Sequence, residues 1–563
     1  RARFIAQWAQ IAEFFDDYPE DLLFFELLNE PHDNVTPAIW NEMIGEGLAE
    51  VRAVNPDRMV LIGTALRGGF NGLAHLVLPA DDALILTPHY YEPFTFTHQS
   101  SHVSGSEAWA GTEWRDSDIE RQAVLDDLAI VTTFAEANDI PVHLGEFGVI
   151  QDADFDSRVR YLRFLTRTFE SLDMSWAVWQ FTSGFTVTDE TTKQFIPELL
   201  NALLHDELPE ANVAQLSPVY TSNFSAGVDG WTRNVHQGAV ASLSGGSGSL
   251  TLDITNGGTA IWHVQLRRAG INLQQGRTYR VTLTGSSAEG LTASTTVAEN
   301  VGSFNPYSGI SMLRFPPEGI THTFFFRMNA DSDSNARINL DIGLAAGTLV
   351  LGEVRIEEYD VLFHPVITTQ PTASTLSEGQ SLGDASLDGG AADVGGLFSF
   401  SDPSIVPPLG TSQQEVTFTP TDTSTHTTTT FFIEVTVESA FANWIDSFFP
   451  GETDPAIVGP EADPDGDGLT NEQEWLVGTD PSDPNSRFTA VQEMVEIDGS
   501  PHFQIQFDTL PGRIYQVQRS STLASDSWVN VGAPISGDGA SHSASAPMAD
   551  DKAFFRVQVE WAD

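Results

Sequence analysis

The chain has 563 residues, and at roughly 150 residues per domain this length predicts several domains rather than one. Against 78 acidic residues stand 26 basic ones, a formal net charge of −52 that disfavours nucleic acids and anionic membrane surfaces as partners. The sequence contains no cysteine, which excludes disulfides and thiolate metal sites, and no apolar run as long as a membrane span. Neutral substrates and cations remain as partners, and we expect a monomer.

Residues 1–205 alternate short apolar runs with longer segments of helical periodicity. This alternation predicts βα units built on a parallel sheet. The expected strands are Leu22–Leu28, Met59–Ile62, Ala83–Leu86, Val142–Leu144 and Trp176–Trp179. Because a (β/α)8 TIM barrel has eight such units, we interpret the block as the C-terminal part of a barrel. The chain begins with Arg1 rather than Met, so we also expect it to be a fragment of a longer gene product.

The rest of the chain is rich in Gly, Ser and Thr and in short alternating strands, a pattern typical of β-sandwiches. We expect one sandwich over residues 218–360, a second over 365–438 and a third over 488–563. An acidic linker over 440–487 separates the last two. The predicted fold class is therefore multidomain, a partial TIM barrel followed by β-sandwich modules.

Two glutamates stand at the ends of predicted strands. Residues 22–32 read LLFFELLNEPH, and Pro31 forces the strand to end at Glu30. Residues 141–148 read PVHLGEFG and place Glu146 at the end of another strand. Active sites of barrels lie at this edge of the sheet. Two carboxylates there suit the general acid and the nucleophile of glycoside hydrolysis.

Glu26 competes for one of these roles. It lies four residues before Glu30, on the same strand face but roughly 13 Å away at about 3.3 Å per residue. The paired carboxyls of glycosidases are about 5 to 9.5 Å apart. We therefore expect Glu26 to be a buried structural acid that pairs with a cation.

Three motifs in residues 1–205 occur in a characteristic order: Asn29-Glu30-Pro31, His89-Tyr90-Tyr91-Glu92-Pro93-Phe94 and Gly145-Glu146-Phe147-Gly148. Through them this region resembles glycoside hydrolase family 5, the cellulase family. The resemblance implies that Glu30 is the general acid/base and Glu146 the nucleophile, with no cofactor for catalysis. It also implies that Asn29 donates to the sugar 2-hydroxyl, that His89 and Tyr91 flank the nucleophile, and that Trp179 is a stacking platform. We expect Trp114 to serve a further sugar subsite.

This resemblance predicts a secreted, modular endo-β-1,4-glucanase that hydrolyses β-glucan by a retaining double displacement. A mannanase or another β-glucan hydrolase on the same scaffold is an alternative, and so is a polysaccharide-binding or adhesion protein without catalysis. The family also uses an Arg and a His from the first half of its barrel, and residues 1–205 include no such segment. We therefore expect this polypeptide to hydrolyse cellulose weakly or not at all.

Residues 218–360 carry Asn223-Phe224, Gly230-Trp231, the run from Trp262 to Leu266, and the run from Gly276 to Tyr279. These resemble carbohydrate-binding modules of the family 4/9 type, which are jelly rolls. We expect Trp231 and Trp262 to contact sugar, with Phe304 and Tyr307 as the alternative platform. Residues 365–438 resemble immunoglobulin-like repeats, and we expect them to act as a spacer.

The acidic linker carries a calcium motif. Its loop places oxygen ligands at the spacing of an EF-hand, with glycine at the sharp turn. The expected ligands are Asp463, Asp465, Asp467, the carbonyl of Leu469, Asn471 and Glu474. The segment resembles dockerin and thrombospondin type-3 repeats. We expect a structural Ca²⁺ that stiffens the linker, and we find no catalytic set in residues 488–563.

Overall fold

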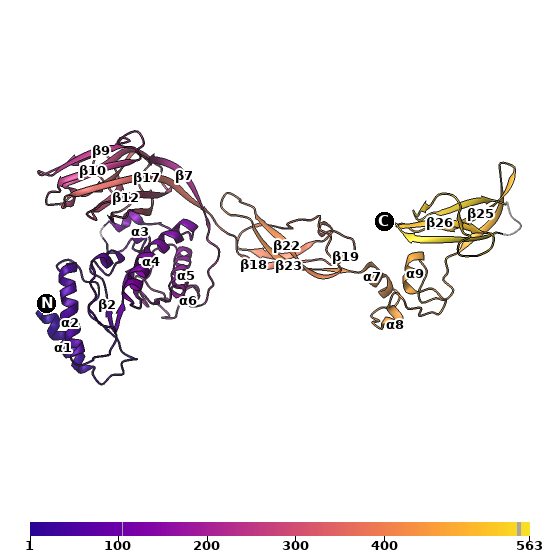
Figure 1. Cartoon of the computed structure of the whole chain (residues 1–563), viewed down its shortest axis with the longest axis horizontal. Coiled ribbons are helices and arrows are strands. Elements are labelled where there is room, and N and C mark those ends of the chain that lie inside the picture. The colour runs from indigo at the N-terminus through magenta and orange to yellow at the C-terminus, as the bar shows by residue number, and fades with distance from the viewer. Residues whose placement is uncertain (104, 549–552, 563) are drawn as a thin grey trace. The chain divides into compact units, whose positions relative to one another are not determined.

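The computed structural model describes residues 1–103, 105–548 and 553–562 (Figure 1). They form two compact units, one of residues 1–364 with 422–427 and one of residues 365–421 with 428–563. None of the described helices is both long and apolar enough to cross a bilayer.

Strands and helices alternate over the first 204 residues. In chain order they are α1 (Ala2–Phe14), β1 (Phe25–Glu26), α2 (Pro37–Arg52), β2 (Val60–Ile62), η1 (Phe70–His75), β3 (Leu84–Leu86), β4 (His89–Tyr90), α3 (Phe94–Thr97), η2 (Ser106–Trp109), α4 (Asp118–Asn138), β5 (His143–Phe147), α5 (Phe155–Ser171), β6 (Ser175–Val178) and α6 (Pro197–Leu204). Strands lie at all five predicted positions, and each is short.

All of these strands pair in parallel. One sheet has the order β1-β2-β3 and the next has the order β4-β5-β6. A parallel bridge between Leu86 and Val142 joins them, because β3 and β4 are two parts of one strand position interrupted at residues 87–88. The parallel direction brings the C-terminal ends of the strands to one edge of the sheet, where Glu146 lies opposite His89.

The helices cover this sheet with apolar faces. In α5 the buried residues Leu162, Leu165 and Phe169 recur at the three- and four-residue spacing of one helix face. Helix α4 begins with a capping box, in which Ser117 and Glu120 exchange hydrogen bonds with each other's backbone N–H.

A two-layer antiparallel sandwich follows. Its strands are β7 (Val213–Ser222), β8 (Thr232–Val235), β9 (Val240–Gly246), β10 (Ser249–Asn256), β11 (Val264–Leu273), β12 (Thr278–Ser286), β13 (Thr292–Ala298), β14 (Ser311–Arg314), β15 (Ile320–Arg327), β16 (Asp333–Asp341) and β17 (Gly347–Leu362), with η3 (Ile261–His263) before β11. One sheet runs β15-β12-β17-β10-β9 with β7 paired to β17, and the other runs β14-β13-β16-β11-β8. Leu252, Val281, Ile338, Leu340 and Ile356 are fully buried between them.

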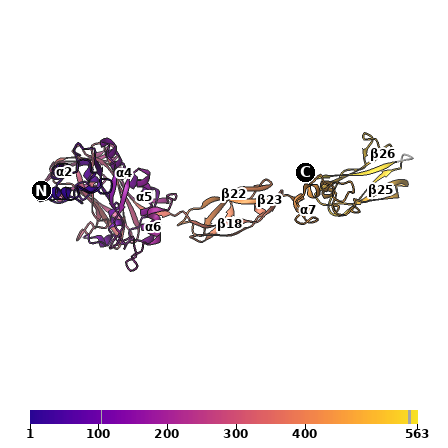
Figure 2. The same cartoon turned by 90° about the horizontal axis from the view of Figure 1, so that it is seen from below.

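The second unit starts with a small β-sandwich, which Figures 1 and 2 show from two sides. It consists of β18 (Ile367–Ala373), β19 (Leu376–Ser377), η4 (Leu382–Asp384), β20 (Leu387–Ala392), β21 (Gly396–Phe400), β22 (Gly410–Pro420) and β23 (Thr429–Glu438). Strands β18 and β20 pair with each other, and the other sheet has the order β19-β23-β22-β21. Val416, Ile433 and Val435 form its core.

Three short helices precede a last β domain. The helices are α7 (Ala440–Asp446), α8 (Pro455–Val458) and α9 (Asn471–Val477). The strands are β24 (Ala490–Ile497), β25 (Ser500–Asp508), β26 (Arg513–Ser520), β27 (Val529–Asn530), β28 (Ile535–Ser536), β29 (Ser541–Pro547) and β30 (Phe554–Trp561). They form a β24-β25-β29 sheet and a sheet in which β26 pairs with β27, β28 and β30.

Two tryptophans predicted to contact sugar are core residues instead. Trp114 is 1% exposed and packs against Tyr161 and Phe164. Trp231 is 2% exposed, lies beside Phe224, and donates from Nε1 to Ser222 Oγ at 3.0 Å. Both predictions are wrong, because neither ring has a face that a ligand could reach.

Replacing Trp231 with alanine is expected to lower the free energy of unfolding of the sandwich by about 3–5 kcal/mol, since the change empties a large core site. Calorimetric unfolding of the full chain measures this loss. Trp262, which is 44% exposed, provides the matched control, and Trp262→Ala should cost less than about 1 kcal/mol. Equal losses for the two variants would contradict the core assignment.

Candidate active site

Glu30 follows β1 at the C-terminal edge of the sheet. Its backbone adopts a φ of 46°, in the left-handed region, so the extended conformation has ended by this residue. The Arg67 N–H donates to the carbonyl of Pro31 and fixes the turn after it. The Glu30 side chain is 29% exposed and therefore accessible from solvent.

A buried histidine links Glu30 to Glu146. His89 Nδ1 lies 3.0 Å from Glu30 Oε1 and 3.5 Å from Glu146 Oε2. The ring nitrogen and one carboxylate oxygen of each glutamate all lie within 4.8 Å of one another. A retaining glycosidase holds its two carboxyls about 5–5.5 Å apart, whereas an inverting one separates them by about 6.5–9.5 Å. The nearest carboxylate oxygens of Glu30 and Glu146 are thus closer together than the inverting range.

Tyr91 contacts the second carboxylate directly. Its hydroxyl donates to Glu146 Oε2 at 2.9 Å. Thr97 Oγ1 donates to the Tyr91 carbonyl at 2.6 Å, and the Tyr91 ring packs edge-on against His98 and Phe185. These contacts hold the phenol in place beside the carboxylate.

Burial and neighbouring groups set the charges here. Burial raises the pKa of Glu146 above its ordinary value, and the negative charge of Glu30 adds to this, while His89 and the Tyr91 hydroxyl act in the opposite direction. Burial, followed by the charge of Glu146, raises the pKa of Tyr91, so the phenol stays protonated and can donate. Burial, followed by the charge of His102, lowers the pKa of His98 to about 4, so that this ring is neutral near pH 7.

Trp179 follows β6 at the same edge of the sheet, and 43% of it is exposed. The backbone N–H of Trp179 donates to the carbonyl of Phe147 at 2.7 Å, which ties Trp179 to the strand that carries Glu146. A Cβ at Gly148 would lie 1.9 Å from the Trp179 carbonyl oxygen, so only glycine allows this approach. Asn29 is exposed beside Glu30, and no hydrogen bond of its side chain occurs among the described residues.

Glu26 and Phe185 were not correctly assigned from the sequence. Glu26 forms no ion pair with any described residue, so the predicted pairing with a cation is wrong; its strand position is exposed, although burial of the carboxyl raises its pKa. Phe185, which contacts both Tyr91 and His98, was missed. It lies in the loop after β6, where no periodicity marks it.

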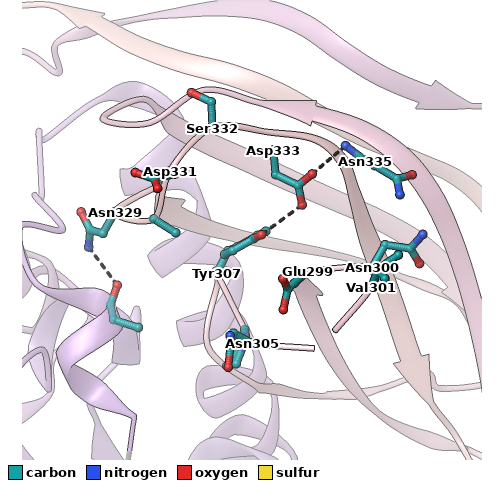
Figure 3. A pocket seen from close by; sticks show the side chains of 13 residues that line it. Glu299, Asn300, Val301, Asn305, Tyr307, Asn329, Asp331, Ser332, Asp333 and Asn335 are labelled. Carbon is teal, nitrogen blue, oxygen red and sulfur yellow. Dashed lines mark hydrogen bonds between the residues drawn. The ribbon is translucent and has the colours of Figure 1, made fainter. Parts of the chain in front are cut away.

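In the first sandwich, the remaining predicted sugar contacts lie in different places. The exposed Trp262 ring lies 5.5 Å from the His236 ring. Tyr307 is partly buried, and its hydroxyl donates to Asp333 Oδ2 at 3.0 Å (Figure 3). Burial and this hydrogen bond raise the pKa of Tyr307 to about 12. Phe304 is 49% exposed and lies 4.5 Å from the Arg337 guanidinium.

A row of polar side chains on β16 and β11 was also missed. Gln265 Nε2 and Asn339 Nδ2 both donate to Asp341 Oδ1 at 2.8 Å. Arg337 and Asn339 are buried, and Arg337 Nε and Asn339 Oδ1 have no hydrogen-bond partner among the described residues. The signal was the polar and apolar alternation of residues 336–341, ARINLD, which places one polar row on a single sheet face.

The predicted calcium loop has unsatisfied oxygens. Single carboxylate oxygens of Asp463, Asp465 and Asp467 lie within 4.8 Å of one another. Asp465 Oδ2, Asn471 Oδ1 and Glu474 Oε2 are buried and have no hydrogen-bond partner among the described residues. Burial and the charges of the three aspartates raise the pKa of Glu474 to about 7. An oxygen-binding cation would relieve both the missing partners and the repulsion.

Comparisons with known proteins identify two of the domains. Residues 1–184 match the family Cellulase (glycosyl hydrolase family 5), and residues 217–348 match a family described as Carbohydrate binding domain. The chain therefore contains a glycosyl hydrolase family 5 domain followed by a carbohydrate-binding domain.

The relatives include several endoglucanases. Endoglucanase H of Acetivibrio thermocellus is 34% identical over 209 residues, which cover 36% of this chain and 22% of that protein. Endoglucanase 3 of Fibrobacter succinogenes is 27% identical over 216 residues, or 32% of this chain and 33% of that protein. The chain thus spans between about a fifth and a third of these curated relatives. Endoglucanase Cel5A of Thermotoga maritima, a solved structure, is 42% identical, with 36% of this chain and 65% of that one covered and a TM-score of 0.35.

Replacing Tyr91 with phenylalanine should raise the pKa of Glu146 further, because the hydrogen bond that favours the charged carboxylate is lost. Carbon-13 NMR titration of the carboxyl groups measures this change. Tyr90→Phe is the matched control, since the Tyr90 hydroxyl donates to Asp127 instead. A Glu146 pKa that stays the same or falls in Tyr91→Phe would show that the hydroxyl does not stabilise the charge.

Proposed function

We propose that this chain is part of a secreted endo-β-1,4-glucanase that cleaves β-glucan with retention of configuration. The observation that carries the proposal is the Glu30, His89 and Glu146 arrangement, in which two carboxylates share one buried histidine. The family 5 match of residues 1–184 and the endoglucanase relatives support the same activity. A neutral polymer also suits a chain of net charge −52, which would repel a polyanion.

In the proposed reaction Glu146 attacks the anomeric carbon while Glu30 donates its proton to the departing glycosidic oxygen. The bond between the sugar and that oxygen breaks, and a covalent glycosyl–enzyme ester forms. Glu30, now a carboxylate, then takes a proton from water, and the resulting hydroxide displaces Glu146. Both glutamates return to their initial protonation states, so the cycle needs no cofactor.

The neighbouring residues have supporting roles in this proposal. Tyr91 stabilises the charge of Glu146 before attack and in the leaving step. The exposed Trp179 ring offers an apolar face to the sugar ring, and Asn29 offers a free amide to the 2-hydroxyl. The carbohydrate-binding domain raises the local concentration of polymer near the catalytic domain.

The linker between residues 440 and 487 is proposed to bind one structural Ca²⁺. Asp463, Asp465, Asp467, Asn471 and Glu474 would supply side-chain oxygens, and Leu469 its carbonyl. The support is the group of buried oxygens without hydrogen-bond partners, together with the positive φ values of 77° at Gly466 and 99° at Gly468, which allow the tight loop. Residues 365–438 act as an immunoglobulin-like spacer in this proposal.

The glutamate assignment is tested by Glu146→Gln and Glu30→Gln in a preparation that hydrolyses carboxymethylcellulose. Each change should lower kcat/KM by roughly 10³-fold or more, because the nucleophile or the proton donor is lost. Glu136→Gln is the matched control, since Glu136 is an exposed residue of α4 and should keep near-native activity.

Activity that survives Glu146→Gln would refute the proposal. The proton NMR spectrum of the fresh product should show the β-anomer first, and an initial α-anomer would exclude double displacement. A panel of cellulose, mixed-linkage glucan and mannan separates a glucanase from a mannanase. A chain that binds these polymers and cleaves none of them would favour an adhesion protein.

For the linker, isothermal titration of the full chain with Ca²⁺ should show one binding event that Glu474→Gln and Asp465→Asn abolish, because each removes a ligand charge. Glu472→Gln changes an exposed residue on the same helix and should leave the event unchanged. If the unmodified chain gave no heat of binding, the calcium site would be rejected.

A further inference from the structure

The first sandwich and the family 5 domain belong to the same compact unit and share a buried interface. An apolar cluster joins Phe325, Tyr359 and Val361 of the sandwich to Ile119 of α4. The Tyr359 hydroxyl donates to the Oγ of Ser117, the residue that caps α4, at 2.7 Å. Burial of apolar side chains against one another favours contact over separation in water. The sandwich is therefore packed on the family 5 domain rather than joined to it by the connecting chain alone.

The interface extends over the loop that leads into α4. Asn329 Nδ2 donates to the carbonyl of Ala108 at 2.8 Å (Figure 3) and to the carbonyl of Ala110 at 2.7 Å. The Arg115 guanidinium donates to Asp360 Oδ1 at 3.1 Å. Because Asn329 follows β15 and Asp360 belongs to β17, two separate parts of the sandwich hold this loop.

Trp109, the last residue of η2, contacts both domains. Its buried indole lies against the backbone of Gly309 in the sandwich, where a Cβ would come within 2.4 Å of Trp109 Nε1. Gly309 also has a φ of 72°, in the left-handed region that favours glycine. Within the family 5 domain, the same indole meets the Phe94 ring edge-on, with 5.9 Å between the ring centroids. A displacement of the sandwich at Gly309 would therefore act first on Trp109 and then on Phe94.

A series of ring contacts continues from Phe94 to the carboxylate pair. The Phe94 ring stacks on the His98 ring, with 3.9 Å between centroids and 17° between planes. The His98 ring lies 4.9 Å from the Tyr91 ring, and the Tyr91 hydroxyl donates to Glu146 Oε2 at 2.9 Å. Packed side chains carry energetic coupling between distant sites when their contacts are continuous, as these contacts are.

We propose that the first sandwich positions the Tyr91 hydroxyl beside Glu146, and that Trp109 is the residue through which it does so. Trp109 is then a positioning residue, which acts on Tyr91 through the rings of Phe94 and His98. The sandwich has in this way a structural part in the active site, in addition to any binding of polymer. The consequence for catalysis rests on the proposed function, whereas the positioning itself is a property of the free chain.

The first test is carbon-13 NMR titration of Glu146 in the full chain. Trp109→Ala should raise the pKa of Glu146 toward the value of Tyr91→Phe, because a Tyr91 ring without its support donates less often to the carboxylate. In the double variant Trp109→Ala with Tyr91→Phe, the pKa should be no higher than in Tyr91→Phe alone, because the hydroxyl that transmits the effect is already absent. A purely structural role of Trp109 would not give this non-additivity.

The second test changes the sandwich alone. Gly309→Ala places a Cβ against Trp109 and should raise the pKa of Glu146 as well. Its matched control is Gly276→Ala, since Gly276 has a similar φ of 81° in the same sandwich but no atom within 4 Å of its Cβ position. Asn329→Ala, at an exposed residue, should act in the same direction as Gly309→Ala, while the exposed Asn335, whose side chain makes no hydrogen bond in the described part of the chain, provides the control Asn335→Ala.

An unchanged pKa of Glu146 in either Trp109→Ala or Gly309→Ala would overturn the proposal. So would a rise that Trp109→Ala produces equally with and without the Tyr91 hydroxyl, or equal effects of Gly309→Ala and Gly276→Ala. Thermal unfolding verifies that each variant is folded, and if Trp109→Ala does not fold, the sandwich variants decide. None of these titrations needs a substrate, so a failure of the proposed hydrolysis and a failure of this positioning role are observed separately.

Discussion

The catalytic arrangement depends on the parallel register that places His89 opposite Glu146. A strand shifted by one residue would turn His89 to the other face of the sheet, and the imidazole could no longer reach both carboxylates. Because Glu30 comes from a third strand position, its distance to Glu146 is also determined through His89. The hydrogen bonds of the sheet, rather than flexible side chains, therefore fix how far apart the two acids lie.

Two carboxylate clusters occur among the described residues, and they differ in whether the protein itself supplies hydrogen-bond donors to them. Around Glu146, the Tyr91 hydroxyl donates a hydrogen bond, and the His89 ring, which is hydrogen-bonded to Glu30, lies 3.5 Å away. Around Glu474, buried oxygens are left without donors, and Thr479 is the residue that contributes a hydrogen bond to its carboxylate. In the proposed function the first cluster therefore works as an acid and a nucleophile without a metal, whereas the second binds a cation.

The five strands of the first domain and the positions of Glu30 and Glu146 could be predicted from the sequence, because proline and apolar runs determine locally where a strand lies and ends. Pro31 had to end one strand and Glu146 stood at the end of a second apolar run, so the two glutamates were placed at the same edge of the sheet. The aromatic residues were harder to assign. Trp114 and Trp231 are surrounded by polar and glycine-rich sequence, yet Trp114 is buried against Tyr161 and Phe164 and Trp231 is buried in the core of the sandwich. Burial of that kind depends on tertiary packing, which also explains why Phe185 in an irregular loop and the open position of Glu26 were not foreseen.

Two glycines, Gly145 and Gly148, flank Glu146 and constrain which strands can lie beside it. A Cβ at Gly145 would lie 2.5 Å from Thr87 Oγ1, and one at Gly148 would meet the carbonyl of Trp179. Each glycine is thus required by a different neighbouring strand. A designer who wished to transplant this acid pair into another scaffold could not move the carboxylates alone. The smallest portable unit is the nucleophile strand, the two strands that press against it, and the end of β1 that carries Glu30.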